Sequence, residues 1–228
     1  MDYKIKSQTY EILYARYLNP YRVVEMVDLA GDLKGKVVAD LCCGGGRLTR
    51  EILKRNPARV FSVDESLDML ENNFKLGDIT IISSVTAPWN TEEYKCACGK
   101  IEFALLDLKS DVIFCQQAVN YWFNTLCVKL IKNALTPKGL FIFNTFHNKP
   151  SVTPTVKTYK MKHKEYTEIS WLVGDRVKHV QVVEGMDPHF TEFRWIPPKE
   201  FRDSFKKNGF KVTVIKSGGT DIYVCKKL

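Results

Sequence analysis

A crowded glycine turn is the most chemically suggestive stretch of this 228-residue chain. Residues 37–49 read VVADLCCGGGRLT, an apolar run that enters an acid, then three consecutive glycines, then the start of an apolar-periodic segment. This order is typical of a strand, a tight turn and the beginning of a helix. Because glycine has no Cβ atom, the backbone of the turn can contact a ligand, and the first amides of the helix can donate hydrogen bonds to it. The stretch therefore predicts a nucleotide-type binding site.

A second acid supports this interpretation. Residues 60–64 (VFSVD) form another apolar run that ends in a carboxylate, Asp64. In nucleotide-binding βαβ units an acid at this spacing accepts hydrogen bonds from ribose hydroxyls. The dinucleotide fingerprint also requires Gly or Ala at its last position. Gly44 and Gly46 fit the first two glycine positions, but Thr49 occupies the last one. The mismatch disfavours NAD or FAD, and the match at Asp64 disfavours a turn that binds no ligand.

The turn resembles the first motif of class I S-adenosylmethionine-dependent methyltransferases, which runs acid, hydrophobe, then small-x-Gly-x-Gly. The matching residues are Asp40, Leu41, Cys42, Gly44 and Gly46, and Cys42 stands where the family usually has its first glycine. The resemblance implies S-adenosylmethionine as the cofactor and S-adenosylhomocysteine as its product. It also implies that Asp40, Cys42, Gly44 and Gly46 contact the cofactor. The likeness extends over the whole chain and is strongest in the first two motifs.

The resemblance assigns further roles by position. The carboxylate of Asp64 would bind the ribose, Met69 would lie against the adenine, and Glu65 is a further cofactor candidate. Members of this family often use an N-terminal helix as a lid over the cofactor. Residues 1–35 carry aromatic and apolar side chains at helical spacing, so we expect a helical lid there. Its candidates for contact with the cofactor are Tyr10 and Tyr14.

The length of a crossover locates the third strand of the expected sheet. Residues 111–115 form another apolar run, and parallel neighbours need a connection of a dozen or more residues. This excludes residues 101–107 as strand three and makes 101–108 a helix. We therefore place the strand at 79–85 and a loop at 87–100, so that no carboxylate ends strand three. The residues left to meet the adenine are Ser84, Val85 and Thr86.

Residues that follow strand 111–115 are expected at the ligand site. In a doubly wound sheet, ligands bind beyond the carboxyl ends of the strands where the strand order reverses, and strands one and four flank that point. We expect Cys115 and Gln116 to face the methionine end of the cofactor. The next candidates, for contact with the methyl acceptor, are Gln117, Asn120 and Tyr121, and Tyr121 is also a catalytic candidate. Helix capping and surface amides are the alternative for each of these residues.

His147 is the best single candidate for a general base. It follows residues 140–144, an apolar run that comes after a helix-stop turn and is expected to be strand five. Histidine titrates near neutral pH, so it can accept a proton from an acceptor group. We also expect His147 to contact the acceptor. The alternative is a polar loop histidine without a chemical role.

Residues 151–196 change character. They alternate apolar and polar residues at period two, with a hairpin turn at Gly174-Asp175, and so predict an antiparallel β-meander. Similar insertions occur in small-molecule methyltransferases, including sugar N,N-dimethyltransferases, where they cover the acceptor pocket or form a dimer contact. The residues that this resemblance suggests for acceptor contact are Trp171, His179, Glu184, His189 and Arg194. Alternation places His179 and Gln181 on one face of the meander.

A last helix at 199–208 and a hairpin of residues 211–216 and 222–226 close the chain. The whole pattern predicts a single α/β domain over residues 1–228. Its core is a doubly wound, Rossmann-like, seven-stranded sheet whose last strand is antiparallel, and the meander is inserted after strand five.

Composition narrows the possible functions. No run of about 18 apolar residues is present, so we expect no membrane span. The first residues lack the apolar core of a signal peptide, which indicates the cytoplasm. The seven cysteines are scattered and predict free thiols, and Cys96-Ala97-Cys98 lacks the further ligands of a closed zinc site, so we expect no metal. The net charge of +8 comes from dispersed lysines, which favours a solvated surface over a nucleic-acid footprint.

Together these features predict methyl transfer to an N or O atom of a small molecule by a monomer or homodimer. The positive charge leaves an RNA methyltransferase as an alternative. The departures at Cys42 and at the end of strand three leave a second one, a cofactor-binding module without transfer activity.

Overall fold

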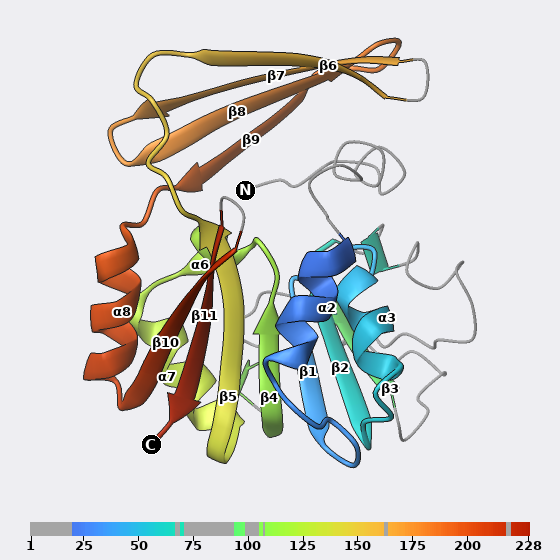
Figure 1. The fold of residues 1–228 in the computed structure, drawn as a ribbon, viewed down its shortest axis with the longest axis vertical. Coiled ribbons are helices and arrows are strands. Elements are labelled where there is room, and N and C mark those ends of the chain that lie inside the picture. Colours follow the sequence, from blue (N-terminus) through green and yellow to red (C-terminus); the bar gives the residue numbers. More distant parts are fainter. Residues whose placement is uncertain are drawn as a thin grey trace.

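The computed structural model describes residues 20–66, 69–70, 94–98, 105–106, 108–161, 164–217 and 220–228. The described strands form two sheets, and the smaller sheet lies beyond one end of the larger one (Figure 1). The larger sheet has seven strands in the order β10-β11-β5-β4-β1-β2-β3. Its strands are β1 Val37–Leu41, β2 Arg59–Asp64, β3 Tyr94–Cys98, β4 Ser110–Cys115, β5 Leu135–Phe146, β10 Phe210–Ser217 and β11 Thr220–Lys227.

Parallel pairing dominates the larger sheet. β1 pairs in parallel with β2 and β4, β2 with β3, and β4 with β5. β11 is antiparallel to both of its neighbours, β5 and β10. The prediction of a doubly wound, Rossmann-like, seven-stranded sheet with an antiparallel last strand is confirmed. The strand order reverses between β1 and β4, and in such sheets this point is where ligands bind.

Helices cover both faces of this sheet. α2 Pro20–Asp28 and α3 Arg47–Leu53 pack on one face, and α7 Thr125–Ala134 and α8 Pro198–Lys207 pack on the other. A short helix, α6 Val119–Trp122, follows β4. Successive side chains of a strand point to opposite faces of a sheet, so each central strand supplies both layers. In β4, for example, Phe114 packs with α2 and α3, whereas Ile113 packs with α7 and α8.

Aromatic rings fill the layer between α8 and the sheet. Phe143 of β5 stacks on Tyr223 of β11 with ring centroids 4.7 Å apart, and Phe201 of α8 lies 5.3 Å from Phe143. Burial of one such side chain contributes about 1.5–3 kcal/mol. This packing fixes β5 against β11, and it thereby fixes the residues at the ends of both strands.

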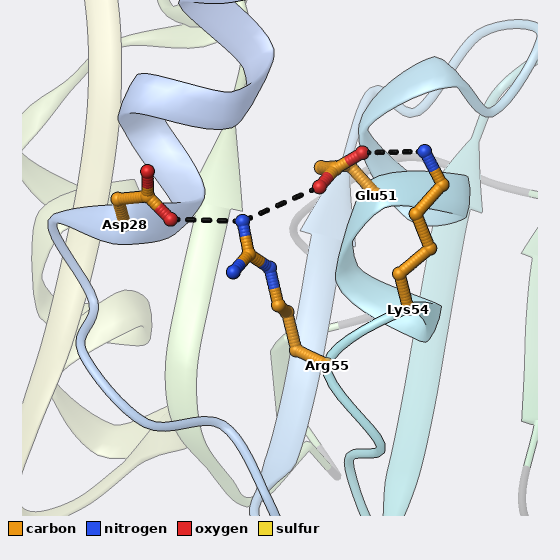
Figure 2. A network of polar contacts seen from close by, with 4 residues as sticks. All are labelled: Asp28, Glu51, Lys54 and Arg55. Atoms are coloured by element: carbon orange, nitrogen blue, oxygen red, sulfur yellow. Dashed lines mark hydrogen bonds and ion pairs between the residues drawn. The ribbon is translucent and has the colours of Figure 1, made fainter.

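Surface ion pairs join α2 to the end of α3 (Figure 2). Arg55 lies 2.8 Å from the carboxylate of Asp28 and 3.4 Å from that of Glu51. Glu51 also pairs with Lys54 at 2.8 Å. Exposed pairs of this kind contribute about 0–1 kcal/mol each. They orient the two helices, while burial of apolar side chains holds both helices on the sheet.

The third strand lies later in the sequence than predicted. β3, which pairs with β2, is Tyr94–Cys98, so the placement of strand three at 79–85 is wrong, and the segment 87–100 is not all loop. Residues 99–109 connect β3 to β4 and come close to the dozen residues that a crossover needs. The apolar run at 79–85 has the more strand-like composition, whereas the sequence YKCAC gives a weak signal.

Several predictions fall on residues outside the described ones. These residues are Tyr10 and Tyr14 of the expected lid, and Ser84, Val85 and Thr86 at the expected adenine site. Leu105 and Leu106 are helical, as expected for residues 101–108. Leu108, the one other described residue of that range, lies outside a helix. The described part of the chain contains no helix that is both long and apolar enough to cross a membrane.

The meander forms a sheet of its own in the order β6-β7-β8-β9. Its strands are β6 Thr155–Met161, β7 Lys164–Val173, β8 Arg176–Val183 and β9 His189–Arg194. All of its strand pairs are antiparallel, and the turn after β7 has Gly174 at φ 62°, so the predicted meander and its hairpin are confirmed. The meander lies beyond the carboxyl ends of the parallel strands, above the point where ligands are expected (Figure 1).

Candidate functional site

Backbone conformation explains the composition of the glycine turn. Cys42, Gly44 and Gly46 have φ angles of 56°, 51° and 75°. Glycine adopts this left-handed region freely, whereas Cys42 does so at a cost of about 1–2 kcal/mol. The amide of Gly46 donates to the carbonyl of Cys43 at 2.9 Å, and the amide of Cys43 donates to the carbonyl of Val63 at 3.0 Å. The turn is therefore anchored to β2 before it enters α3.

Asp64, the last residue of β2, holds the turn from the side. Its Oδ2 accepts a hydrogen bond from the amide of Gly44 at 2.9 Å, and its Oδ1 accepts one from the amide of Ser66 at 2.9 Å. A carboxylate has about four acceptor positions, so Asp64 keeps capacity for a ligand. Burial raises the pKa of Asp64, and the two backbone amides oppose that rise. The turn and this acid form one structural unit.

Asp40 lies beneath the turn and is fully buried. Its Oδ2 accepts a hydrogen bond from the hydroxyl of Thr49 at 2.7 Å, and Thr49 also contacts Ser62 at 2.8 Å. Its Oδ1 has no partner among the described residues. Burial raises the pKa of Asp40 to about 7, with the hydrogen bond from Thr49 acting against the rise and Asp64 adding to it. The site thus holds a buried carboxyl group whose pKa is raised toward neutrality and whose Oδ1 has no partner among the described residues.

The two cysteines of the predicted site meet between β1 and β4. A hydrogen bond with Cys115 and burial raise the pKa of Cys42 well above its ordinary value, and both thiols are free. The side chain at the family's first-glycine position is therefore a neutral thiol held against β4. Met69, the residue expected near the adenine, is buried, and its amide lies 3.4 Å from the hydroxyl of Ser66. Glu65 lies between Asp64 and Ser66.

The segment after β4 is fastened to β5. Gln117 has a φ of 55°, and its amide donates to Oδ1 of Asn144 at 2.8 Å. Asn144 is buried, and its Nδ2 has no partner among the described residues. Gln116 lies in the chain between Cys115, the last residue of β4, and Gln117. The structure therefore brings Gln116 and Gln117 to the ends of β4 and β5, next to a buried donor, Nδ2 of Asn144.

Asn120 joins three elements. It lies on α6, and its Nδ2 donates to the carbonyl of Arg194 in β9 at 3.0 Å. Its Oδ1 accepts a short hydrogen bond from the hydroxyl of Thr145 in β5. All three residues lie at the interface between the large sheet and the meander. Asn120, which we expected to face the acceptor, thus has both polar atoms engaged by the protein.

His147 is paired with a buried carboxylate. Its Nδ1 lies 2.9 Å from Oδ1 of Asp221, a residue near the start of β11. The register of β5 and β11 places Thr145 opposite Asp221, and this brings the side chain of His147 within reach. Asp221 is buried, whereas the side chain of His147 is 38% exposed. In the tautomer that donates from Nδ1 to the carboxylate, Nε2 is left as an acceptor that solvent or a ligand can reach.

Three aromatic rings form a row that includes Phe146, the residue before His147 in the chain. Phe193 of β9 packs against Tyr121 of α6 at 5.6 Å and stacks on Phe146 of β5 at 5.7 Å. Tyr121 and Phe146 remain 38% and 41% exposed. Partly exposed aromatic side chains form a surface that suits a flat apolar ligand.

One face of the meander points toward the large sheet, because Phe193 on that face contacts α6 and β5. The strand register puts His179, Gln181 and Thr191 on the same face. Nδ1 of His179 lies 3.5 Å from the hydroxyl of Thr191. Burial lowers the pKa of His179 to about 4, and the neighbouring His189 adds to this effect. The imidazole of His179 is therefore neutral at physiological pH.

Trp171 and Arg194 lie on the opposite face of the meander. Trp171 pairs with Lys178 and Arg194 pairs with Arg176, and both partners alternate with His179 along β8. The guanidinium of Arg194 forms ion pairs at 3.1 Å with Asp175 and Glu200. The structure does not bring these two side chains together with His179, so their roles stay predictions.

Some residues at the site were missed by the sequence analysis. They are Thr49, Ser62, Asp221, Phe146 and Phe193. Thr49 had a signal, because it stands in the last position of the glycine motif on a helix that faces Asp40. Asp221 had none, since the contact with His147 joins residues 74 positions apart.

Residues 32–209 match the model of a family described as a methyltransferase domain. The chain belongs to this methyltransferase family. A ubiquinone biosynthesis O-methyltransferase of Neisseria meningitidis serogroup C (strain 053442) is 25% identical to it over 134 residues, which are 58% of this chain and 53% of that protein. The chain spans about half the length of the curated relatives that it matches.

Solved structures show the same fold for this methyltransferase. An S-adenosylmethionine-dependent methyltransferase from Clostridium acetobutylicum ATCC 824 aligns over 97% of both chains with a TM-score of 0.72 and 19% identity. CalS10, an amino pentose methyltransferase from Micromonospora echinaspora, aligns over 96% of this chain and 97% of that one, with a TM-score of 0.72 and 15% identity. The fold is that of S-adenosylmethionine-dependent methyltransferases.

The polar groups of the methyltransferase site fit S-adenosylmethionine. Oδ1 of Asp40 is a buried acceptor without a partner among the described residues, and Asp64 has remaining acceptor capacity. A buried acceptor is stable only when a donor reaches it. The cofactor carries such donors, in its ammonium group and its ribose hydroxyls, and the left-handed turn between the two acids lets the backbone approach it.

Proposed function

We propose that the protein transfers a methyl group from S-adenosylmethionine to an oxygen or nitrogen atom of a small molecule. One observation carries this proposal. The glycine turn is hydrogen-bonded to Asp64, the last residue of β2, and the turn and this acid form one unit. It lies at the reversal of strand order, beneath a meander that can enclose an acceptor. The family membership of the chain supports the same reaction class.

In this proposal the residues of the turn hold the cofactor. Asp64 accepts hydrogen bonds from the ribose, Met69 lies against the adenine, and Asp40 receives a donor from the methionine end or from a bridging water. When bound, the cofactor supplies an activated methyl group on a sulfonium. The protein therefore acts mainly by aligning acceptor, methyl carbon and sulfur, and such alignment can contribute about 7–11 kcal/mol to the barrier reduction.

The acceptor would lie between the end of β5 and the meander. Two kinds of small-molecule methyltransferase are similar to this chain, one named for O-methylation and one for an amino pentose. The surface between these elements presents His147, Tyr121 and Phe146, with His179 on the side of the meander. These groups suit a small molecule with an apolar ring and a polar substituent.

Calorimetry tests the first half of the proposal. The full chain should bind S-adenosylhomocysteine with one site per chain, and the replacement Asp64→Ala should weaken that binding. A chain that is folded by circular dichroism but shows no binding of S-adenosylmethionine or S-adenosylhomocysteine would contradict the proposal. Binding without methyl transfer to any acceptor in a screen would support a cofactor-binding module. Transfer to RNA with salt-dependent affinity would support the RNA alternative.

A further inference from the structure

We propose that Asp221 is a positioning residue for a general base at His147, and that the methyl acceptor is a hydroxyl group on an aromatic ring. This inference rests on the proposed function, because it assigns chemistry to the same site. It goes further in naming the substrate class and in giving a role to a buried carboxylate on the antiparallel strand.

The contact between the two side chains is built into the sheet. Nδ1 of His147 lies 2.9 Å from Oδ1 of Asp221, and the carboxylate is buried. Asp221 stands two residues before Tyr223, whose ring stacks on Phe143, so the packed core fixes the strand that carries the carboxylate. A buried, fixed carboxylate holds the imidazole in the tautomer with a proton on Nδ1. Nε2 then faces outward as a proton acceptor on a partly exposed ring.

With His147 as the base, every proton, bond and charge in the methyl transfer is accounted for. The O–H bond of the acceptor breaks and its proton moves to Nε2 of His147. The acceptor oxygen forms a bond to the methyl carbon as the bond from that carbon to sulfur breaks. The positive charge on sulfur is thereby replaced by positive charge on the imidazolium, which the carboxylate of Asp221 stabilises. Because the ring of His147 is partly exposed, it can then pass the proton to water.

A positioned general base indicates that the methyl acceptor is a hydroxyl group rather than an amine. An amine can lose its proton to water before it binds, so its neutral form needs no base at the moment of transfer. A phenolic hydroxyl has a pKa of about 10 and stays protonated near neutral pH. It is a weak nucleophile until a base accepts its proton. The pair of His147 and Asp221 therefore matches a hydroxyl acceptor.

The neighbouring aromatic side chains indicate that the hydroxyl belongs to an aromatic ring. Phe146 is adjacent to His147 in the chain, and Phe193 joins it to Tyr121 in a row of three rings. Exposed parts of Tyr121 and Phe146 offer ring surface to a ligand. Aromatic rings prefer offset-stacked or edge-to-face contacts with one another, so a phenol fits this surface better than a saturated ring does.

Two matched acceptors test the inference with the full chain. Catechol keeps its hydroxyl protonated near neutral pH, whereas 4-nitrocatechol is already ionised at pH 8. The variants are His147→Gln and the near-isosteric Asp221→Asn, with Asp203→Asn on the exposed surface of α8 as the matched control. Transfer of labelled methyl from S-adenosylmethionine gives kcat for each acceptor, and calorimetry with S-adenosylhomocysteine checks that the cofactor site is intact.

A base and its positioning residue predict an effect that depends on the acceptor. With catechol, kcat should fall about 100-fold in His147→Gln and at least about 10-fold in Asp221→Asn. With 4-nitrocatechol, both variants should stay within about threefold of the unmodified chain, because the acceptor needs no base. The control should match the unmodified chain on both acceptors.

Three results would overturn the inference while leaving the proposed function in place. The first is an unmodified chain that binds S-adenosylhomocysteine and methylates amines but neither catechol nor 4-nitrocatechol. The second is a loss of kcat by the same factor on both acceptors in the variants, which would indicate a structural role. The third is an unchanged kcat on catechol in both variants. Absence of S-adenosylhomocysteine binding by the folded, unmodified chain would instead contradict the proposed function itself.

Discussion

The carboxylate of Asp64 and the backbone amide of Gly44 are joined by a hydrogen bond of 2.9 Å, which closes the glycine turn onto β2. The acid that we propose for the ribose is therefore also a support of the turn. Its second oxygen accepts a hydrogen bond from the amide of Ser66. Ser66 begins the segment that carries Met69. One side chain thus couples the shape of the turn to the positions of both candidate cofactor elements.

Replacing Asp64 by Ala should weaken cofactor binding and destabilise the fold together. The part-buried amides of Gly44 and Ser66 lose their acceptor, and an unmet amide costs up to about 1–3 kcal/mol when it is buried. We expect the dissociation constant of S-adenosylhomocysteine to rise at least about 10-fold. Calorimetry and thermal unfolding measure the two effects. Asp203→Asn, a change at an exposed carboxyl group, should alter neither, and an Asp64→Ala chain with unchanged affinity would contradict a role in the site.

Replacing Asp40 by Asn should stabilise the protein at high pH relative to low pH. Burial raises the pKa of Asp40 to about 7 from its ordinary value of 3.8. The folded state therefore holds this proton more tightly than the unfolded state, and the contribution of Asp40 to stability is lost as the pH rises through 7. Asp40→Asn removes that loss, which can reach roughly 4 kcal/mol.

The measurement for Asp40 is the free energy of unfolding from denaturant titrations at pH 5 and pH 8. The difference between Asp40→Asn and the unmodified chain should shift in favour of the variant at pH 8. An equal difference at both values would contradict a raised pKa. The same variant should bind S-adenosylhomocysteine more weakly, because a neutral amide oxygen is a weaker acceptor than a carboxylate for a hydrogen bond from an ammonium group.

Replacing Asn120 by Ala should loosen the meander from the large sheet. The change removes the donor to the carbonyl of Arg194 and the acceptor for the hydroxyl of Thr145. We expect a loss of about 1–3 kcal/mol and faster amide hydrogen exchange in β9. Asn133→Ala, at an exposed position of α7, is the control and should be neutral. Unchanged exchange in β9 would show that Asn120 does not hold the meander.

Local patterns predicted much of this fold because each depends on neighbouring residues. The glycine turn, the hairpin at Gly174 and the helix that Gly209 ends are visible from residue type and period alone. β3 was misplaced because Tyr94–Cys98 is short and chemically mixed, while the apolar run at 79–85 carries a stronger strand signal. Strand composition cannot decide between two candidates when pairing is what selects one of them.

The residues of the candidate site also divide into those that local sequence predicts and those that depend on long-range pairing. His147 could be found because it follows an apolar strand at the ligand edge of the sheet. Its partner Asp221 could not, because the contact depends on the register of β5 against β11. Asn120 was assigned to the acceptor from its place after β4, but its side chain is engaged by Thr145 and by the backbone of β9. Sequence order predicted where the candidate site lies, and long-range pairing determines which partners its side chains have.

Acid should loosen the meander through His179. Burial lowers the pKa of this residue to about 4 from its ordinary value of 6.5, so the folded state favours the neutral imidazole. Its contribution is fully present above pH 6.5 and is lost as the pH falls through 4, by up to roughly 3 kcal/mol. His179→Gln, which cannot be protonated, should remove this dependence. The measurement is amide hydrogen exchange in β8 between pH 6.5 and 4, corrected for intrinsic exchange rates. Exchange in α8 is the internal reference. Equal acid sensitivity of β8 in both chains would assign the effect to other groups on that face, such as His189 or Glu168.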